Sequence, residues 1–125
     1  MNVLIPVGIA VLVVLVLAIK RSPSARHIAA SLSPDDRTFI AEQLEPITRM
    51  PVTTDADEQA WYAATRAAME RLESRFPDVA SVVPHQLYHY FADADIYRKE
   101  PSFRGTWEQY VLEFIRELRA PAAKT

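Results

Sequence analysis

The sequence predicts an all-α protein, with a single N-terminal transmembrane helix followed by a small bundle of about four helices. The first 20 residues are almost wholly apolar, and several later segments repeat apolar residues at helical spacing. No segment shows the sustained alternation of a half-buried strand. The 125 residues divide into an anchor at 1–20, a basic juxtamembrane linker at 21–32, a helical domain at 33–119 and a disordered tail at 120–125.

The predicted anchor is the apolar run from Val3 to Ile19, which contains no charged or polar side chain. A helix of this length rises about 25 Å, close to the roughly 30 Å of the hydrocarbon core. A secretory signal peptide is the alternative interpretation. However, only the amino terminus is positive before this run, and the run is longer than the usual apolar region of a signal peptide. We therefore expect an uncleaved anchor.

Basic residues follow the anchor and none precedes it: Lys20, Arg21 and Arg26. Positively charged flanks stay in the cytoplasm, so we expect the amino terminus outside and the C-terminal domain in the cytoplasm. The layout is that of a single-pass protein of a bacterial inner membrane. The same three side chains are the expected contacts with anionic membrane lipid.

The composition beyond the anchor excludes several classes of function. Residues 27–125 carry 11 basic and 16 acidic side chains, a net charge of −5, which argues against a nucleic-acid partner. The absence of cysteine excludes disulfides, thiolate metal sites and a cysteine nucleophile. Gly105 is the only glycine in this part, so neither a Gly-rich phosphate loop nor the hydrolase G-x-S-x-G elbow is present.

The first two helices of the domain are each predicted from residues typical of a helix N-terminus. Ser33 stands as an N-cap with Pro34 at the first helical position and Asp36 at the third. The second helix starts after Thr54 and ends before Pro77. Both carry apolar stripes: Phe39, Ile40, Leu44 and Ile47 in the first, and Trp61, Ala64, Ala68, Met69, Leu72 and Phe76 in the second.

The third helix begins either near Asp78 or at Pro84, and we expect the later start because proline inside a helix is costly. Leu87, Tyr88 and Phe91 are expected to face the core, and Asp93 or Asp95 to cap a following turn at 96–99. The fourth helix is expected to start at Thr106. Its apolar stripe comprises Trp107, Tyr110, Val111, Phe114, Ile115 and Leu118.

His85 and His89 stand one helical turn apart, followed by Asp93 on the same side. His85 and Asp93 lie about 12 Å apart along a helix, too far to share one ion. Gln86 also replaces the glutamate that follows the first histidine in metalloproteases. We therefore predict no catalytic residue, metal or cofactor. The alternative is a membrane-tethered metalloprotein or hydrolase that uses the two histidines.

Aromatic residues are concentrated towards the C-terminus, with eight of the chain's twelve between Tyr88 and Phe114. This is more than one small core would hide, so some are expected at the surface beside arginines, a composition typical of partner-binding surfaces. The predicted function is a non-enzymatic, membrane-anchored helical adaptor or accessory subunit that binds a membrane-associated protein. The predicted partner-binding residues are Tyr90, Tyr97, Arg98, Phe103 and Arg104.

Overall fold

The computed structural model describes residues 24–121, which fold into six α-helices and one 3₁₀ turn. No strand occurs among them, in agreement with the all-α prediction. The helices pack as a small bundle. Their bounds are α2 (Ala25–Ser31), α3 (Pro34–Thr48), α4 (Asp55–Arg75), the 3₁₀ turn η1 (Val79–Ser81), α5 (Gln86–Ala92), α6 (Ala94–Lys99) and α7 (Pro101–Arg119).

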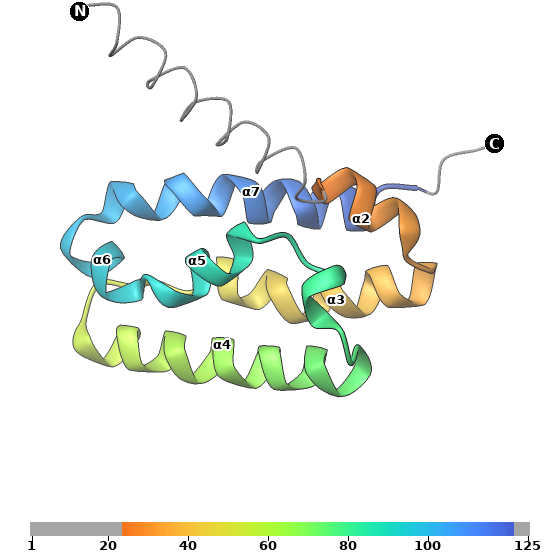
Figure 1. Ribbon diagram of the computed structural model, residues 1–125. Coiled ribbons are helices and arrows are strands. Elements are labelled where there is room, and N and C mark those ends of the chain that lie inside the picture. The colour runs from red at the N-terminus through yellow and green to blue at the C-terminus, as the bar shows by residue number, and fades with distance from the viewer. Residues whose placement is uncertain (1–23, 122–125) are drawn as a thin grey trace, which may run out of the picture.

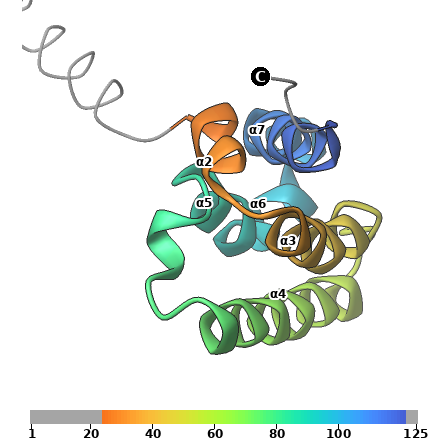
Figure 2. The ribbon, with the colours of Figure 1, turned by 90° about the vertical axis from the view of Figure 1, so that its right-hand side faces the viewer.

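The long helices α7 and α4 lie at opposite edges of the bundle (Figure 1). Figure 2 shows α3 between them on one side, with α5 and α6 on the other, and α2 against α7. One core lies between these layers. Its largest fully buried side chains are Trp61, Tyr90, Tyr97, Phe114, Ile40, Leu44, Leu72, Leu87, Val83 and Val111.

The predicted starts of the first two domain helices are confirmed. The backbone N–H of Asp36 donates to Ser33 Oγ at 3.1 Å, at the start of α3. At the start of α4, Thr54 and Asp57 form a reciprocal capping box, with bonds of 3.1 and 3.2 Å. Hydrogen bonds from Thr53 are the largest cause that lowers the pKa of Asp57. These caps satisfy backbone donors that would otherwise lack a partner.

The later start of the third helix is the better of the two predicted starts, because α5 begins at Gln86, two residues after Pro84 and with His85 as its N-cap. The predicted start of the fourth helix at Thr106 is wrong. Helix α7 begins at Pro101, which suits the first helical position because its ring fixes φ and its missing N–H is not needed there. Gly105 therefore lies inside the helix, and an added Cβ there would meet nothing within 4 Å.

Part of the segment predicted to be a linker belongs to the bundle. Residues 25–31 form α2, whose N-cap Ser24 accepts the backbone N–H of His27 at 3.2 Å. Ile28 is only 2% exposed in this helix, which packs on α7. Arg37 Nε also donates to the carbonyl oxygen of Ala29 at 2.8 Å, so α2 is joined to α3. The packed domain thus begins before residue 33.

The predicted anchor at 1–20, including Lys20, lies outside the described residues, as do Arg21 and residues 122–125 of the predicted tail. Arg26 is described and is exposed in the first turn of α2. Within the part of the chain that the structure describes, none of the helices combines the length and apolar character that a membrane span requires.

We expect the substitution Ile28→Ala to destabilise the bundle by about 2–4 kcal/mol, because it removes a buried side chain between α2 and α7. Urea unfolding of residues 24–125, followed by circular dichroism, measures the change. His27→Ala is the matched control on the same helix, since His27 is exposed and its loss should change stability by under about 0.5 kcal/mol. Equal stability of the two variants would mean that α2 contributes nothing to the core.

Candidate functional site

Two of the predicted partner-binding residues lie in the core. Tyr90 is 0% exposed and Tyr97 is 1% exposed, so the expectation that they remain at the surface is wrong. Both rings pack edge-on against Trp61, at centroid distances of 5.0 and 5.9 Å. The Tyr97 hydroxyl donates to the carbonyl oxygen of Tyr90 at 2.9 Å. Burial raises the pKa of both phenols, so they stay protonated in the folded protein.

Arg104 is held inside the bundle rather than presented to a partner. Its side chain is 18% exposed, and its guanidinium carbon lies 5.0 Å from the centroid of the Trp61 ring. The guanidinium nitrogens donate to the Glu108 carboxylate at 2.6 Å, the carbonyl oxygens of Met50 at 2.6 Å and Thr48 at 3.0 Å, and the Tyr90 hydroxyl at 3.3 Å. These bonds join α7 to α5 and to the C-terminal end of α3.

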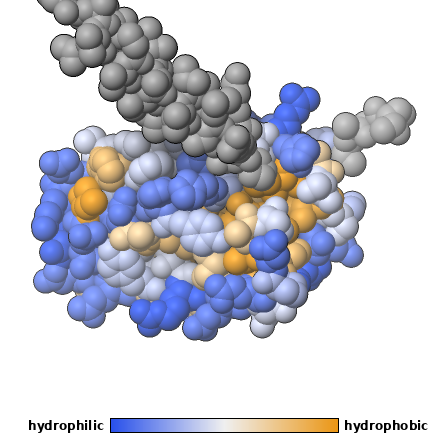
Figure 3. Space-filling view, viewed as in Figure 1, coloured by the Kyte–Doolittle hydropathy of each residue, from blue (hydrophilic) through white to orange (hydrophobic). Residues whose placement is uncertain are grey.

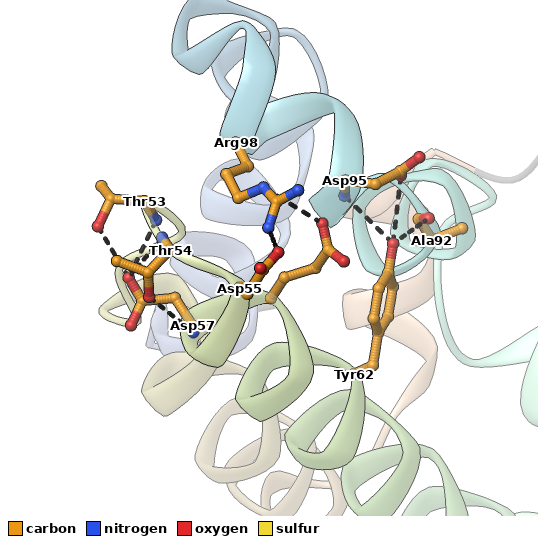
Figure 4. Close-up of polar contacts among 9 residues, drawn as sticks. Thr53, Thr54, Asp55, Asp57, Tyr62, Ala92, Asp95 and Arg98 are labelled. Atoms are coloured by element: carbon orange, nitrogen blue, oxygen red, sulfur yellow. Dashed lines mark hydrogen bonds and ion pairs between the residues drawn. The ribbon is translucent and has the colours of Figure 1, made fainter.

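Arg98 and Phe103 also serve contacts within the bundle. Arg98 forms an ion pair with Asp55, and its Nε lies 3.7 Å from Glu58 Oε1, which ties α6 to the first turn of α4 (Figure 4). The half-buried Phe103 ring lies 6.3 Å from the ring of Tyr97. The five predicted residues are therefore close together in space, but they do not form a free surface.

A different set of aromatic residues borders a shallow groove of about 280 Å³ between α4 and α5. One wall is fixed by Tyr62, whose hydroxyl donates to the carbonyl oxygen of Ala92 at 3.1 Å and accepts the backbone N–H of Asp95 at 3.2 Å (Figure 4). Tyr88 is 37% exposed there, although the sequence pattern placed it in the core. The groove is lined by Tyr62, Thr65, Arg66, Met69, Tyr88, Phe91 and Ala92.

The Tyr88 end of this groove is acidic. Burial is the main cause that raises the pKa of Tyr88, and the nearby carboxylates of Glu73 and Asp78 raise it further. Both carboxylates are exposed. The groove therefore combines aromatic and methionine walls, which contribute contact area, with the exposed Arg66 in its lining and the two carboxylates near Tyr88. Aromatic residues and methionine are enriched in this way at protein interfaces.

A second groove, of about 580 Å³ between α3 and α4, is bordered largely by charged side chains. The Arg75 guanidinium covers the Phe39 ring at 4.6 Å from its centroid, and pairs with Asp36 at 2.9 Å. The exposed apolar area on this side is thus already covered by an arginine of the chain itself. Figure 3 shows a separate apolar area beside α2 and over the segment that contains η1. Leu32, which follows α2, and Val79 and Val82 of the η1 segment are half-buried.

The two histidines meet at the surface of α5. The Nε2 atoms of His85 and His89 lie 3.0 Å apart. The His89 ring stacks on Trp107, with centroids 4.5 Å apart and planes 14° apart. Trp107 Nε1 donates to Asp93 Oδ2 at 3.1 Å, so this carboxylate binds an indole instead of capping α6. Trp107 itself is half-buried, contrary to its predicted place in the core stripe.

No group of three or more histidine, aspartate or glutamate side chains is arranged around a common metal position within residues 24–121. The chain matches no protein-family model, no curated protein and no solved structure. The groove between α4 and α5 is lined by aromatic, methionine and arginine side chains of two helices.

The side of α5 that faces the core differs from the side that the sequence pattern predicted. Leu87, Tyr90 and Phe91 follow one another at intervals of three and one residues, and all three are buried. This is the spacing of one helical face. Because this face of α5 points into the core, the Tyr88 side chain points outward into the groove. Tyr62 and Met69 of the groove lie on α4, and nothing in the sequence pairs that helix with α5.

We expect Arg104→Lys to lower the free energy of unfolding by about 2–3 kcal/mol, because lysine keeps the charge but lacks the fork that reaches several acceptors at once. Arg116→Lys is the matched control on the same helix, since Arg116 is exposed. Its expected change is under about 0.5 kcal/mol. Urea unfolding of residues 24–125 compares the two variants. If the free energy of unfolding falls equally in both variants, the hydrogen bonds of the Arg104 guanidinium contribute nothing specific to stability.

Proposed function

We propose that this chain is a non-enzymatic, single-pass membrane-anchored adaptor or accessory subunit that binds a membrane-associated protein through the groove between α4 and α5. The composition of the groove carries the proposal. Tyr62, Met69, Tyr88 and Phe91 supply apolar and aromatic walls on two helices. Side chains of this kind dominate the energy of protein interfaces when they become fully covered.

The charge around the groove selects the chemistry of the partner. Glu73 and Asp78 lie near Tyr88 and are exposed, and residues 27–125 carry a net charge of −5. A complementary partner presents an amphipathic segment whose apolar side chains fill the groove and whose lysine or arginine lies beside these carboxylates. Complementary charge contributes mainly to the association rate and to specificity, and salt weakens it.

With a membrane anchor, an interface of modest affinity is sufficient to bind the partner. The apolar run from Val3 to Ile19 would hold the domain at the inner membrane, where tethering raises the effective concentration of a membrane-bound partner. The basic residues Lys20, Arg21 and Arg26 would contact anionic lipid. The apolar area beside α2 in Figure 3 adjoins the start of the domain and would lie towards the membrane surface.

A photo-crosslinkable residue in place of Arg66, on the groove, should capture a membrane-associated protein from cells that express the full chain. The same residue in place of the exposed Arg116 on α7 should not capture it. We expect the captured protein to contain an apolar segment next to lysine or arginine. The crosslinked peptide, identified by mass spectrometry, locates this segment. Capture from position 116 alone would place the interface elsewhere.

The affinity of the full chain for that segment should fall at least tenfold on Tyr88→Ala, because Tyr88 supplies exposed aromatic area in the groove. Tyr110→Ala is the matched control, since Tyr110 is 44% exposed on α7, away from the groove. It should change the dissociation constant by less than about twofold. Fluorescence anisotropy with a labelled segment measures both. An equal loss in the two variants would remove the groove from the proposal.

The proposed topology places the C-terminus in the cytoplasm, because the basic residues follow the apolar run. A reporter enzyme that is active only outside the cytoplasm, fused after Thr125, should therefore remain inactive. A cytoplasmic reporter at the same position should be active and serves as the control for expression. Strong activity of the external reporter would reverse the orientation.

A further inference from the structure

His85 and His89 meet through their Nε2 atoms, which share a hydrogen bond. His85 has helical backbone angles (φ −54°, ψ −36°) directly before α5, which puts its side chain one turn from that of His89. The two Nε2 atoms are 3.0 Å apart, and the ring planes are inclined by 80°. His85 is exposed and His89 is half-buried, so the position between them is open to solvent.

The separation of the two nitrogens matches the span of two adjacent ligands on one metal ion. With metal–nitrogen bonds of about 2.05 Å, nitrogens 3.0 Å apart subtend an angle of about 94° at the ion. A tetrahedral site would need a separation of about 3.3 Å. An angle near 90° is that of neighbouring positions in square-planar or tetragonal coordination, which copper(II) and nickel(II) prefer with nitrogen ligands.

The surroundings hold His89 in this orientation. Its ring stacks on Trp107, and the indole is in turn fixed by its hydrogen bond to Asp93. A ligand whose ring is already oriented loses less conformational freedom when the ion binds. The spacing of the two histidines in the sequence shows neither the distance of 3.0 Å between their Nε2 atoms nor the contact of His89 with α7, so it predicted no metal there.

We propose that His85 and His89 form a two-histidine site for a divalent transition-metal ion, copper(II) or nickel(II). The ion displaces the hydrogen bond between the two Nε2 atoms: the ring that donates it shifts its proton from Nε2 to Nδ1 by exchange with water, and each Nε2 then donates one lone pair to the ion. Two ligands leave the remaining positions to water or to a donor from a bound protein. The site is therefore exchangeable and of moderate affinity. It is independent of the α4–α5 groove and of the proposed adaptor function.

Trp107 provides a direct readout, because copper(II) quenches the fluorescence of an indole in contact with one of its ligands. The full chain, purified in mild detergent without a histidine tag and stripped with a chelator, is titrated with copper(II) chloride alone. We expect saturable quenching with one equivalent per chain, reversed by a chelator. In Trp107→Phe most of the quenching should disappear, while calorimetry still reports one bound ion.

His85→Gln and His89→Gln should each weaken copper binding at least tenfold. His27→Gln is the matched control, because His27 is an exposed histidine on α2 and should leave the dissociation constant within twofold. Circular dichroism checks that each variant keeps its helices, and the use of two separate variants protects against the misfolding of one. Binding that persists unchanged in both, or an absence of saturable quenching, would overturn the proposed site.

Discussion

The bundle depends on one guanidinium, that of Arg104, which supplies donors where α3 ends. The last carbonyls of a helix have no partner within the helix, and that of Thr48 accepts a hydrogen bond from Arg104, as does the carbonyl of Met50 just beyond the helix. A positive charge at this end also suits the helix dipole. Because Arg104 lies on α7, this contact fixes the distance between α7 and α3 while Trp61 of α4 covers the guanidinium.

This arrangement explains how a small core accepts so many amphipathic rings. Each buried ring has a partner for its polar atom: Trp61 Nε1 donates to the carbonyl oxygen of Phe91 at 3.0 Å, the Tyr97 hydroxyl donates to that of Tyr90 at 2.9 Å, and the Tyr90 hydroxyl accepts from Arg104 at 3.3 Å. Buried indole and phenol groups are stable when such partners exist. The short helices α5 and α6 are therefore held by side-chain to backbone bonds as well as by apolar packing, which leaves Tyr88 free to border the groove.

The fold could be predicted from the sequence where the signals are local. The caps at Ser33 and Thr54 and the break before Pro84 depend on neighbouring residues, and all three are present. The side of α5 that faces the core was not predicted correctly, because a helix of seven residues makes only two turns and allows more than one apolar stripe. The groove and the contact between His89 and Trp107 join different helices, so their existence depends on packing that no local pattern contains.

Gly105, inside α7, gives this architecture a defined point of weakness. Glycine in a helix is less favourable than alanine by about 1 kcal/mol, and here no neighbouring side chain compensates. It follows Arg104 directly, so fraying of the first turns of α7 would release the end of α3 and the adjoining α6 together. In the language of native-state hydrogen exchange, we expect these segments to form one cooperative opening unit, with α4 and the C-terminal half of α7 exchanging more slowly. Local opening of this kind would expose the amphipathic rings to solvent at one end of the bundle at a time. The free energy of each local opening would lie well below the free energy of global unfolding.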